Sequence, residues 1–228
     1  MKVLMVNDIA DCGESYYLPF RKYGQRQDIV HFDVLELGSD IGMAVFCGGS
    51  DVSPELYGSK SHPKTYSDKK RDEQELKIAN WCKDNNIPMV GICRGAQFLC
   101  AFSGGSLVQH VSNHNQSHKI KTLEDKEFMV NSIHHQMQIP PDESEILAYS
   151  EGVSDCYEVY DGTVDLDKEP EAVCYYGNGV RALGFQWHPE IMSQHDEGVK
   201  FVHKMIYRCF DIACEENIYA EEHDEDGW

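Results

Sequence analysis

The sequence lacks any long apolar run. No stretch approaches the roughly 20 consecutive apolar residues that a membrane-spanning helix requires, and the short apolar start is broken by Asn7 and Asp8. That interruption leaves no apolar core of the kind that a secretory signal peptide needs. We therefore expect a protein without a membrane partner, located in the cytoplasm.

Positive charge is scarce, since the chain has 20 Lys and Arg residues against 39 Asp and Glu residues, a formal net charge of −19. Nucleic-acid backbones and anionic membranes would be repelled by this balance, so we expect neither as a partner. Acidic residues crowd into residues 215–228, which we interpret as a solvated tail. A length of 228 residues suits one α/β domain, so we predict a single domain over residues 1–214 followed by this tail.

C-x-x-C pairs are also missing, although the chain has nine cysteines. Their absence argues against a thiolate zinc site and against a thioredoxin-type redox pair. An odd number of scattered cysteines favours reduced thiols over disulfides. A phosphate-binding P-loop is absent too, which leaves no ATP-dependent synthetase domain within the sequence.

What the sequence does contain is an alternation of apolar strands and amphipathic helices. We predict strands at residues 3–6, 29–37, 43–46, 89–92, 128–130, 146–149, 172–176 and 181–186. Helices are predicted at 72–85, at 94–102 and from Ser193, a candidate N-cap with Asp196 three residues later. Because the crossovers are long enough for parallel connections, the pattern indicates an open α/β sheet flanked by helices.

A candidate nucleophile stands where a predicted strand turns directly into a helix. The sequence there is Gly91-Ile92-Cys93-Arg94-Gly95. A sharp strand-to-helix turn raises its central side chain above the sheet, and small residues two positions away on each side leave room for close backbone. The first turn of a helix favours a thiolate, and its N–H groups, that of Arg94 among them, can donate to an oxyanion. On its own, the pattern fits a buried structural cysteine equally well.

Two other segments supply what a cysteine nucleophile needs. His188 follows a predicted strand, and Pro189 prevents helix continuation, so that Glu190 can fold back and orient the imidazole. Gly48 and Gly49 end another strand, where backbone without side chains can approach a substrate and donate an N–H to an oxyanion. We therefore predict a catalytic set of Cys93, His188 and Glu190.

Together these residues resemble the class I glutamine amidotransferases. Residues 91–97 look like the G-x-C-x-G-x-Q nucleophile motif of that family, and residues 187–190 match its H-x-E motif. Further segments are similar to the free-standing γ-glutamyl hydrolases, of the γ-glutamyl-γ-aminobutyrate hydrolase and peptidase C26 type. They are residues 48–54, Tyr57-Gly58, Arg71-Asp72, Arg94, residues 104–107, Gln109 and residues 130–136.

The resemblance implies a flavodoxin-like three-layer sandwich with a mostly parallel central sheet. It also implies a small γ-glutamyl amide as substrate, with the glutamyl part seated by Gln97, Asn131, Ser132 and His134. Cys93 would form a γ-glutamyl thioester and expel an amine or ammonia, after which water would release glutamate. This chemistry requires neither a metal nor an organic cofactor.

Other functions compete with the free-standing hydrolase. The chain could be a glutaminase subunit that delivers ammonia to a separate synthetase partner, or a catalytically silent regulatory module. An α/β-hydrolase of the dienelactone type shares the elbow but would carry its acid before a late histidine, whereas here Glu190 follows His188.

Two groups of residues outside the predicted catalytic set could also carry chemistry. Cys47 stands where many relatives have proline, and we interpret it as a packing residue. His110, His114 and His118 would share a helix face and could bind a metal, but the polar residues between them favour a loop.

Overall fold

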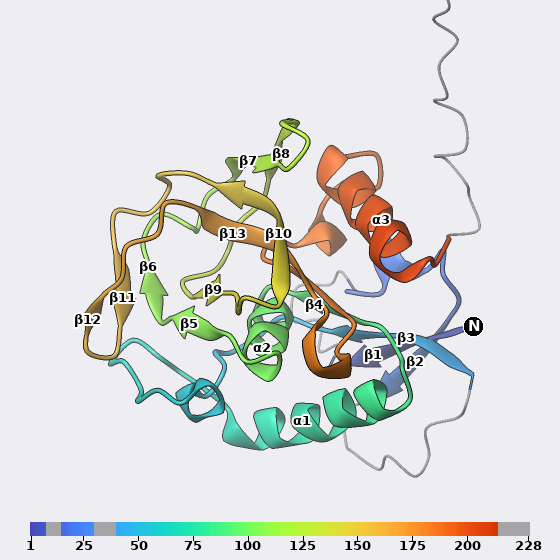
Figure 1. Ribbon diagram of the computed structural model, residues 1–228. Helices are drawn as coiled ribbons and strands as arrows, with labels where there is room; N and C mark the ends of the chain where they lie inside the picture. Colours follow the sequence, from blue (N-terminus) through green and yellow to red (C-terminus); the bar gives the residue numbers. More distant parts are fainter. Residues whose placement is uncertain (8–14, 30–39, 214–228) are drawn as a thin grey trace, which may run out of the picture.

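The computed structural model describes residues 1–7, 15–29 and 40–213, and within them one large sheet organises the molecule (Figure 1). Its spatial order is β2 (Gln25–Ile29), β1 (Lys2–Val6), β3 (Ile41–Phe46), β4 (Met89–Ile92), β14 (Ala182–Phe185), β13 (Glu169–Tyr175), β10 (Ser144–Ser150), β7 (His118–Thr122) and β8 (Glu127–Val130). The strands from β2 to β14 pair in parallel, and those from β14 to β8 pair antiparallel.

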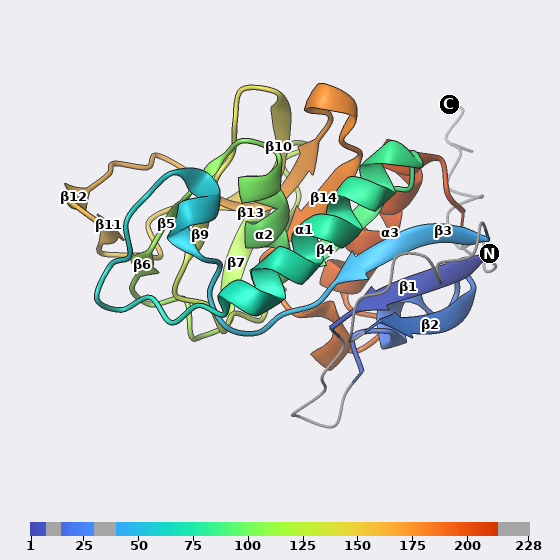
Figure 2. The same ribbon diagram turned by 90° about the horizontal axis from the view of Figure 1, so that it is seen from below.

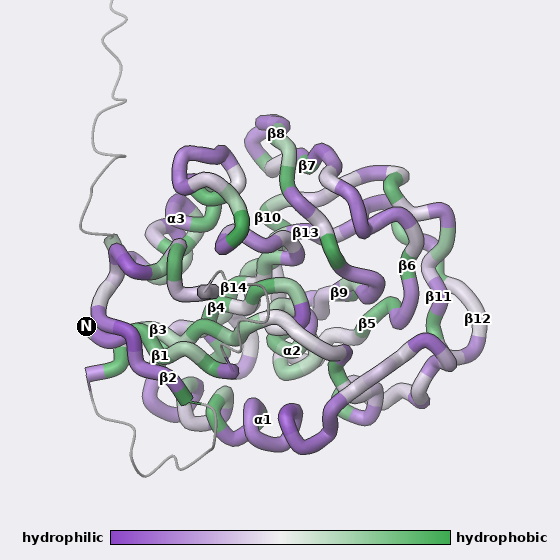
Figure 3. The backbone as a smooth tube through the Cα atoms, turned by 180° about the vertical axis from the view of Figure 1, so that it is seen from behind, coloured by the Kyte–Doolittle hydropathy of each residue, from purple (hydrophilic) through white to green (hydrophobic). Residues whose placement is uncertain are grey.

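Helices cover both faces of the parallel half, namely α1 (Lys69–Asp84), α2 (Arg94–Phe102) and α3 (Glu197–Phe210). Alternate residues of β1 point to opposite faces, since Val3 and Met5 share a buried cluster with α3 while Leu4 and Val6 share one with α1 and α2. Figure 2 shows these three layers, and Figure 3 shows the apolar stretches gathered in the central strands. The predicted flavodoxin-like three-layer sandwich is confirmed.

Two small sheets stand beside the antiparallel half. One pairs β5 (Ser106–Val108) with β9 (Met137–Ile139), and the other contains β12 (Gly162–Thr163), β11 (Tyr157–Val159) and β6 (His110–Val111). Short 3-10 helices occupy Leu18–Phe20, Pro54–Tyr57, Gly177–Gly179 and Pro189–Ile191. The sequence patterns predicted neither small sheet, because strands of two or three residues carry too little periodicity to register.

The predicted elements mostly coincide with the observed ones, and α2 has the predicted bounds. One prediction was wrong: α3 begins at Glu197 with Asp196 in the N-cap position, whereas Ser193 stands three residues earlier. The Asp196 carboxylate accepts a hydrogen bond from the Ser193 N–H at 3.0 Å, which fixes the preceding turn. Of the strand predicted at residues 29–37, only the start falls within the described residues, where Ile29 ends β2.

The histidines predicted to be in a polar loop are not on a helix. His110 lies in β6, His114 in the following turn and His118 at the start of β7. The predicted acidic tail at residues 215–228 lies outside the described residues. In the portion of the chain that the structure describes, none of the helices combines the length and the apolar character needed to cross a membrane.

Candidate active site

Cys93 occupies a strained elbow between β4 and α2. Its backbone angles are φ 52° and ψ −109°, a conformation that residues with a side chain rarely adopt. A Cβ on Gly95 would lie 2.0 Å from the Phe46 carbonyl oxygen, and one on Gly91 would lie 2.4 Å from the Gly95 carbonyl oxygen. The glycines on both sides of Cys93 are therefore required by close backbone packing.

His188 and Glu190 lie at the end of β14, beside this elbow. His188 Nδ1 is 2.6 Å from Glu190 Oε1, and the Glu190 side chain is buried. The Cys93 side chain interacts electrostatically with the His188 ring. Burial disfavours the charged imidazolium, but the interactions with Cys93 and Glu190 outweigh that effect and raise the pKa of His188 to about 10. The structure thus brings the three predicted catalytic residues together.

Asn131 holds the backbone of His188 with both atoms of its amide group. Its Oδ1 accepts from the His188 N–H at 2.7 Å, and its Nδ2 donates to the His188 carbonyl oxygen at 2.8 Å. These two bonds join the loop that follows β8 to the end of β14. Asn131 therefore fixes where the imidazole stands relative to Cys93.

The glycine loop after β3 faces the same imidazole. A Cβ on Gly48 would lie 3.4 Å from His188 Cε1 and 2.3 Å from the Tyr16 hydroxyl oxygen. Gly49 has φ +142° and a Cβ there would lie 2.1 Å from Arg71 Nη1. Since Arg94 opens α2, its backbone N–H has no carbonyl of its own helix to bond. Bare backbone therefore lies against the triad where the sequence predicted it, although its role towards an oxyanion stays a prediction.

A buried ion network lies behind the elbow and joins α1 to α2. The Arg94 guanidinium is 1% exposed and contacts the carboxylates of Asp72 and Glu75. Arg71 Nε donates to the same Glu75 at 2.8 Å. Burial and the nearby charge of Arg71 lower the pKa of Arg94 to about 9, against the opposing effect of Asp72. Two arginines and two carboxylates thus balance their charges, and all of them except Arg71 are buried.

The same network fixes the glycine loop through backbone contacts. Arg71 Nη2 donates to the Cys47 carbonyl at 2.8 Å, and Arg94 Nε donates to the Ser50 carbonyl at 3.2 Å. The Ser53 N–H donates to Asp72 Oδ2 at 2.9 Å. The sequence patterns did not single out Glu75. The signal that could have indicated Glu75 was its helical spacing from Arg71 and Asp72, on the side of α1 that packs inward.

The remaining predicted site residues lie in the loop between β8 and β9 and on α2. Gln97 Nε2 donates to the Gln136 carbonyl at 3.0 Å, and the Ser132 hydroxyl donates to the His114 carbonyl at 2.7 Å. His134 Nδ1 lies 2.9 Å from the same Gln136 carbonyl. These contacts order the loop. The predicted seating of a glutamyl group by Gln97, Asn131, Ser132 and His134 stays a prediction.

A cluster of histidines and glutamates underlies that loop. His114 lies 3.4 Å from Glu169 and 3.6 Å from Glu171, and His118 Nε2 lies 2.8 Å from Glu171. Potential ligand atoms of His114, His134 and Glu171 lie within 4.8 Å of one another. The rings of His114 and His134 are tilted by 33° to one another, with centroids 4.6 Å apart.

Protonation supplies the positive charge that this cluster needs. Burial opposes it, but hydrogen bonding and attraction to Glu171 raise the pKa of His118. Glu169 is already satisfied by hydrogen bonds from Ser150, Ser154 and Tyr157. We therefore describe this group as a buried cluster of ionisable side chains.

Two further side chains border the candidate site. Tyr16 lies with its ring centroid 6.1 Å from that of His188, and no sequence motif indicated it. Cys47 is buried in the cluster that includes α3, with its Sγ 3.8 Å from the Val45 carbonyl oxygen, in line with a packing role. The cysteines within the described residues form no disulfides with one another.

Comparison with known proteins finds a matching family profile and proteins of similar sequence. The peptidase C26 family profile matches residues 33–143. The YvdE homolog of Lactococcus lactis subsp. cremoris, described as glutamine amidotransferase-like, is 36% identical over 157 residues, covering 58% of this chain and 84% of that protein. The γ-glutamyl-γ-aminobutyrate hydrolase of Escherichia coli O157:H7 is 28% identical over 189 residues, covering 74% of this chain and 70% of that protein.

The fold has solved counterparts as well. A glutamine amidotransferase from Thermotoga maritima superposes with a TM-score of 0.57 at 16% identity, covering 91% of this chain and 82% of that one. At this identity the likeness concerns the fold alone. The family assignment rests on the sequence matches, and by them the chain belongs to the glutamine amidotransferase-like proteins of the peptidase C26 family, within the class I glutamine amidotransferase superfamily.

Proposed function

We propose that this protein hydrolyses γ-glutamyl amides with Cys93 as nucleophile, His188 as acid and base, and Glu190 as the residue that orients His188. The observation that carries the proposal is the elbow itself. Cys93 is held in a strained conformation beside an imidazole that stays protonated at neutral pH and whose Nδ1 is 2.6 Å from a buried carboxylate. A cysteine and a protonated histidine in contact form the kind of ion pair that activates a thiolate.

The reaction follows from that pair in two halves. The Cys93 thiolate attacks the γ-carbonyl carbon, and the His188 imidazolium gives its proton to the departing amine as the C–N bond breaks. Neutral His188 then takes a proton from water, whose oxygen attacks the γ-glutamyl thioester. Breaking the C–S bond releases glutamate and restores the ion pair, so the net change is one water consumed and one amine released.

Negative charge on the carbonyl oxygen would be stabilised by backbone N–H groups of Gly48, Gly49 and Arg94. The position of Gly48 against His188 and the start of α2 at Arg94 support this role. Gln97, Ser132 and His134 would seat the glutamyl part of the substrate. Asn131 would act through His188, since both atoms of its amide bond the His188 backbone.

The similarity to a γ-glutamyl-γ-aminobutyrate hydrolase supports a γ-glutamyl amide as substrate and a protein that works without a synthetase. Turnover by the purified chain tests this. We expect release of glutamate from small γ-glutamyl amines to exceed release from glutamine. Slow glutamine turnover that rises only when a synthetase partner is added would contradict the free-standing hydrolase and favour the glutaminase role.

Substitution of Cys93 tests the mechanism. Cys93→Ala should abolish turnover, and mass spectrometry of the unaltered protein during turnover should detect a γ-glutamyl adduct on the peptide that contains Cys93. Cys100→Ala is the matched control, because Cys100 lies on α2 within the core, and its sulfur bonds the backbone carbonyls of Ser106 and Ile139. Full activity in Cys93→Ala would refute the mechanism.

A further inference from the structure

A second group of reactive side chains lies on the small sheet that contains β6 and β11. These strands pair antiparallel with Glu158 opposite His110, and Cys156 precedes Glu158 by two residues. Side chains directly opposite each other, and side chains two apart on one strand, project from the same face of a sheet. The pairing therefore places the imidazole of His110 beside the carboxylate of Glu158, and the thiol of Cys156 stands just before β11 begins at Tyr157.

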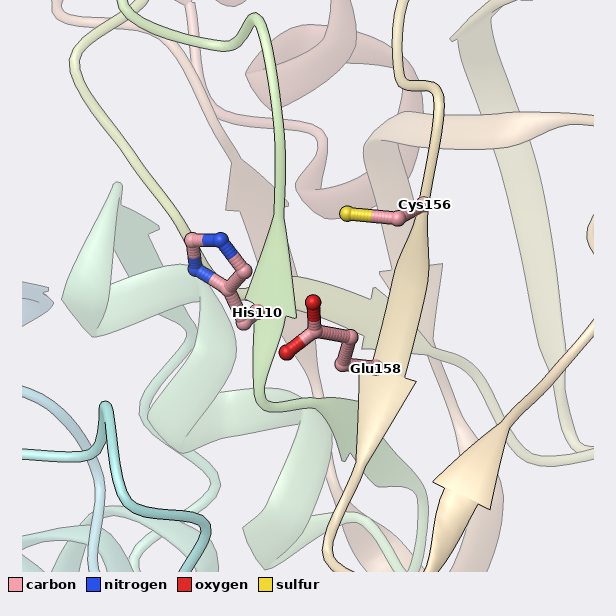
Figure 4. A group of neighbouring side chains, drawn as sticks. All are labelled: His110, Cys156 and Glu158. Carbon is pink, nitrogen blue, oxygen red and sulfur yellow. The ribbon is translucent and has the colours of Figure 1, made fainter.

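The three side chains converge. Figure 4 shows the sulfur of Cys156 and the carboxylate of Glu158 extending towards the imidazole of His110. Ligand atoms of the three residues lie within 4.8 Å of one another. His110 Nδ1 is buried and has no hydrogen-bond partner.

Two neighbours border this group from the loop that precedes α1. His62 Nε2 lies 3.1 Å from Glu158 Oε2, and the ring of His62 runs parallel to that of His110 with centroids 6.4 Å apart. Lys64 Nζ lies 3.3 Å from both carboxylate oxygens of Glu158. The Lys64 side chain is 49% exposed, so it can turn into solvent when a cation takes its place.

We propose that Cys156, His110 and Glu158 form a binding site for a divalent metal ion of the zinc class. One thiolate, one imidazole and one carboxylate make up a donor set of intermediate softness, which suits Zn²⁺ better than Mg²⁺ or Ca²⁺. The three residues are partly exposed, so solvent can supply a fourth ligand. The acidic surface would attract the ion electrostatically.

The site stands apart from the triad but not far from the glycine loop. The ring of His110 lies 5.7 Å from that of His135, whose Nε2 is 3.0 Å from Asp51 Oδ1, two residues after Gly49. A bound ion would therefore fix the β6–β11 pair beside this loop. The hydrolytic mechanism proposed above does not depend on that ion.

Zinc binding is measured with the full chain after removal of metal by EDTA. We expect one Zn²⁺ per chain in competition with a chromophoric chelator, and with Co²⁺ an absorption band from thiolate-to-cobalt charge transfer. Residues that only orient a metal ligand contribute about 10- to 100-fold to metal affinity, and a ligand itself should contribute at least as much. Cys156→Ser and His110→Ala should therefore each weaken zinc binding by at least about 100-fold, and Cys156→Ser should abolish the cobalt band.

Two controls separate this site from other thiols. Cys209→Ser alters another partly buried cysteine, on α3, and should leave zinc binding unchanged. Cys93→Ala should do the same, whereas loss of zinc in Cys93→Ala with retention in Cys156→Ser would assign the ion to the triad and overturn the proposal. If Cys156→Ser does not fold by circular dichroism, Glu158→Gln provides the second ligand variant, and full zinc affinity in it would equally overturn the site.

Discussion

At the scale of single residues, His188 shows how neighbours set a protonation state. An isolated buried imidazole loses its charge, as His134 does here, where burial lowers the pKa to about 3. His188 is also largely buried, but hydrogen bonds and attraction from Cys93 and Glu190 raise its pKa to about 10. These two histidines titrate far apart because the interactions with Cys93 and Glu190 outweigh burial at His188, whereas the attraction to Glu171 does not outweigh burial at His134.

We expect ¹⁵N NMR of labelled histidines to find His188 protonated from pH 6 to pH 9 and titrating near pH 10. Removing the thiol by Cys93→Ala should lower the pKa of His188, since Cys93 supplies the largest contributions that raise it. His134 is the internal control, because it should remain neutral throughout the same range. A neutral His188 at pH 7 in the unaltered protein would contradict the ion pair.

The same shift has a consequence for stability. A group whose pKa is raised by folding stabilises the folded state fully below its unfolded pKa, near 6.5, and this contribution is lost as pH rises towards the folded pKa of about 10. The free energy of unfolding should therefore fall between pH 6.5 and pH 10 more steeply in the unaltered protein than in His188→Gln. Parallel pH profiles for the two proteins, from urea denaturation, would contradict this.

In the proposed mechanism, Glu190 acts on the reaction through His188. Glu190→Gln keeps the shape but removes the charge that fixes the tautomer of the imidazole, so we expect kcat to fall by about 10²- to 10⁴-fold with little change in KM. Steady-state kinetics on one γ-glutamyl amide measures this. Glu197→Gln, in an exposed position at the start of α3, is the control and should retain activity. A change confined to KM would argue against an orienting role.

At the scale of elements, the Arg94 network links α1, α2 and the glycine loop. Each helix alone would expose its charged residues, but packed together they bury Arg94, Asp72 and Glu75 as a unit. A buried ion pair adds little net stability compared with apolar packing, whereas breaking it leaves a charge without a partner. The network therefore serves to fix the relative positions of the loop and the elbow.

Arg94→Met should lower the free energy of unfolding by about 3–5 kcal/mol, because two carboxylates would remain buried without the guanidinium. It should also reduce kcat, because the contact with the Ser50 carbonyl is lost. Lys204→Met is the matched control, since it breaks an exposed ion pair with Glu124, for which the expected cost is below about 1 kcal/mol. Urea denaturation compares the two, and equal losses would contradict the role assigned to Arg94.

At the scale of the whole molecule, a net charge of −19 acts on every surface at once. Mutual repulsion of acidic groups destabilises a compact chain, and salt screens it as the Debye length shrinks from about 30 Å at 0.01 M to about 8 Å at 0.15 M. Exposed ion pairs weaken over the same range, but each contributes under about 1 kcal/mol. Screening of the repulsion should therefore dominate.

We expect Tm to rise by on the order of 2–4 °C per kcal/mol of repulsion relieved as the salt concentration increases from 0.01 M to 0.15 M. Calorimetry with EDTA present excludes stabilisation by bound metal. Choline chloride should act like sodium chloride if screening is the cause. A Tm that falls with both salts would mean that the exposed ion pairs outweigh the repulsion.

Local patterns in the sequence predicted much of the fold and the residues of the proposed triad. The strand–Cys93–helix elbow and the segment around His188 are each contiguous, so spacing and residue type were enough to predict them. The role of Gly91 and Gly95 could be predicted for the same reason, because backbone packed this closely leaves no room for a side chain. The sequence also indicated that His110, His114 and His118 would not form a helix face.

Tertiary structure alone decided which distant residues meet. Glu75 joins Arg94, Tyr16 borders His188, and His110 stands opposite Glu158 only because separate elements are packed or paired. No short sequence motif could have revealed that Cys156 and His110 meet, since the two residues lie far apart along the chain. Periodicity reports how a residue relates to its own helix or strand, whereas contacts between elements depend on the packing of the whole sheet.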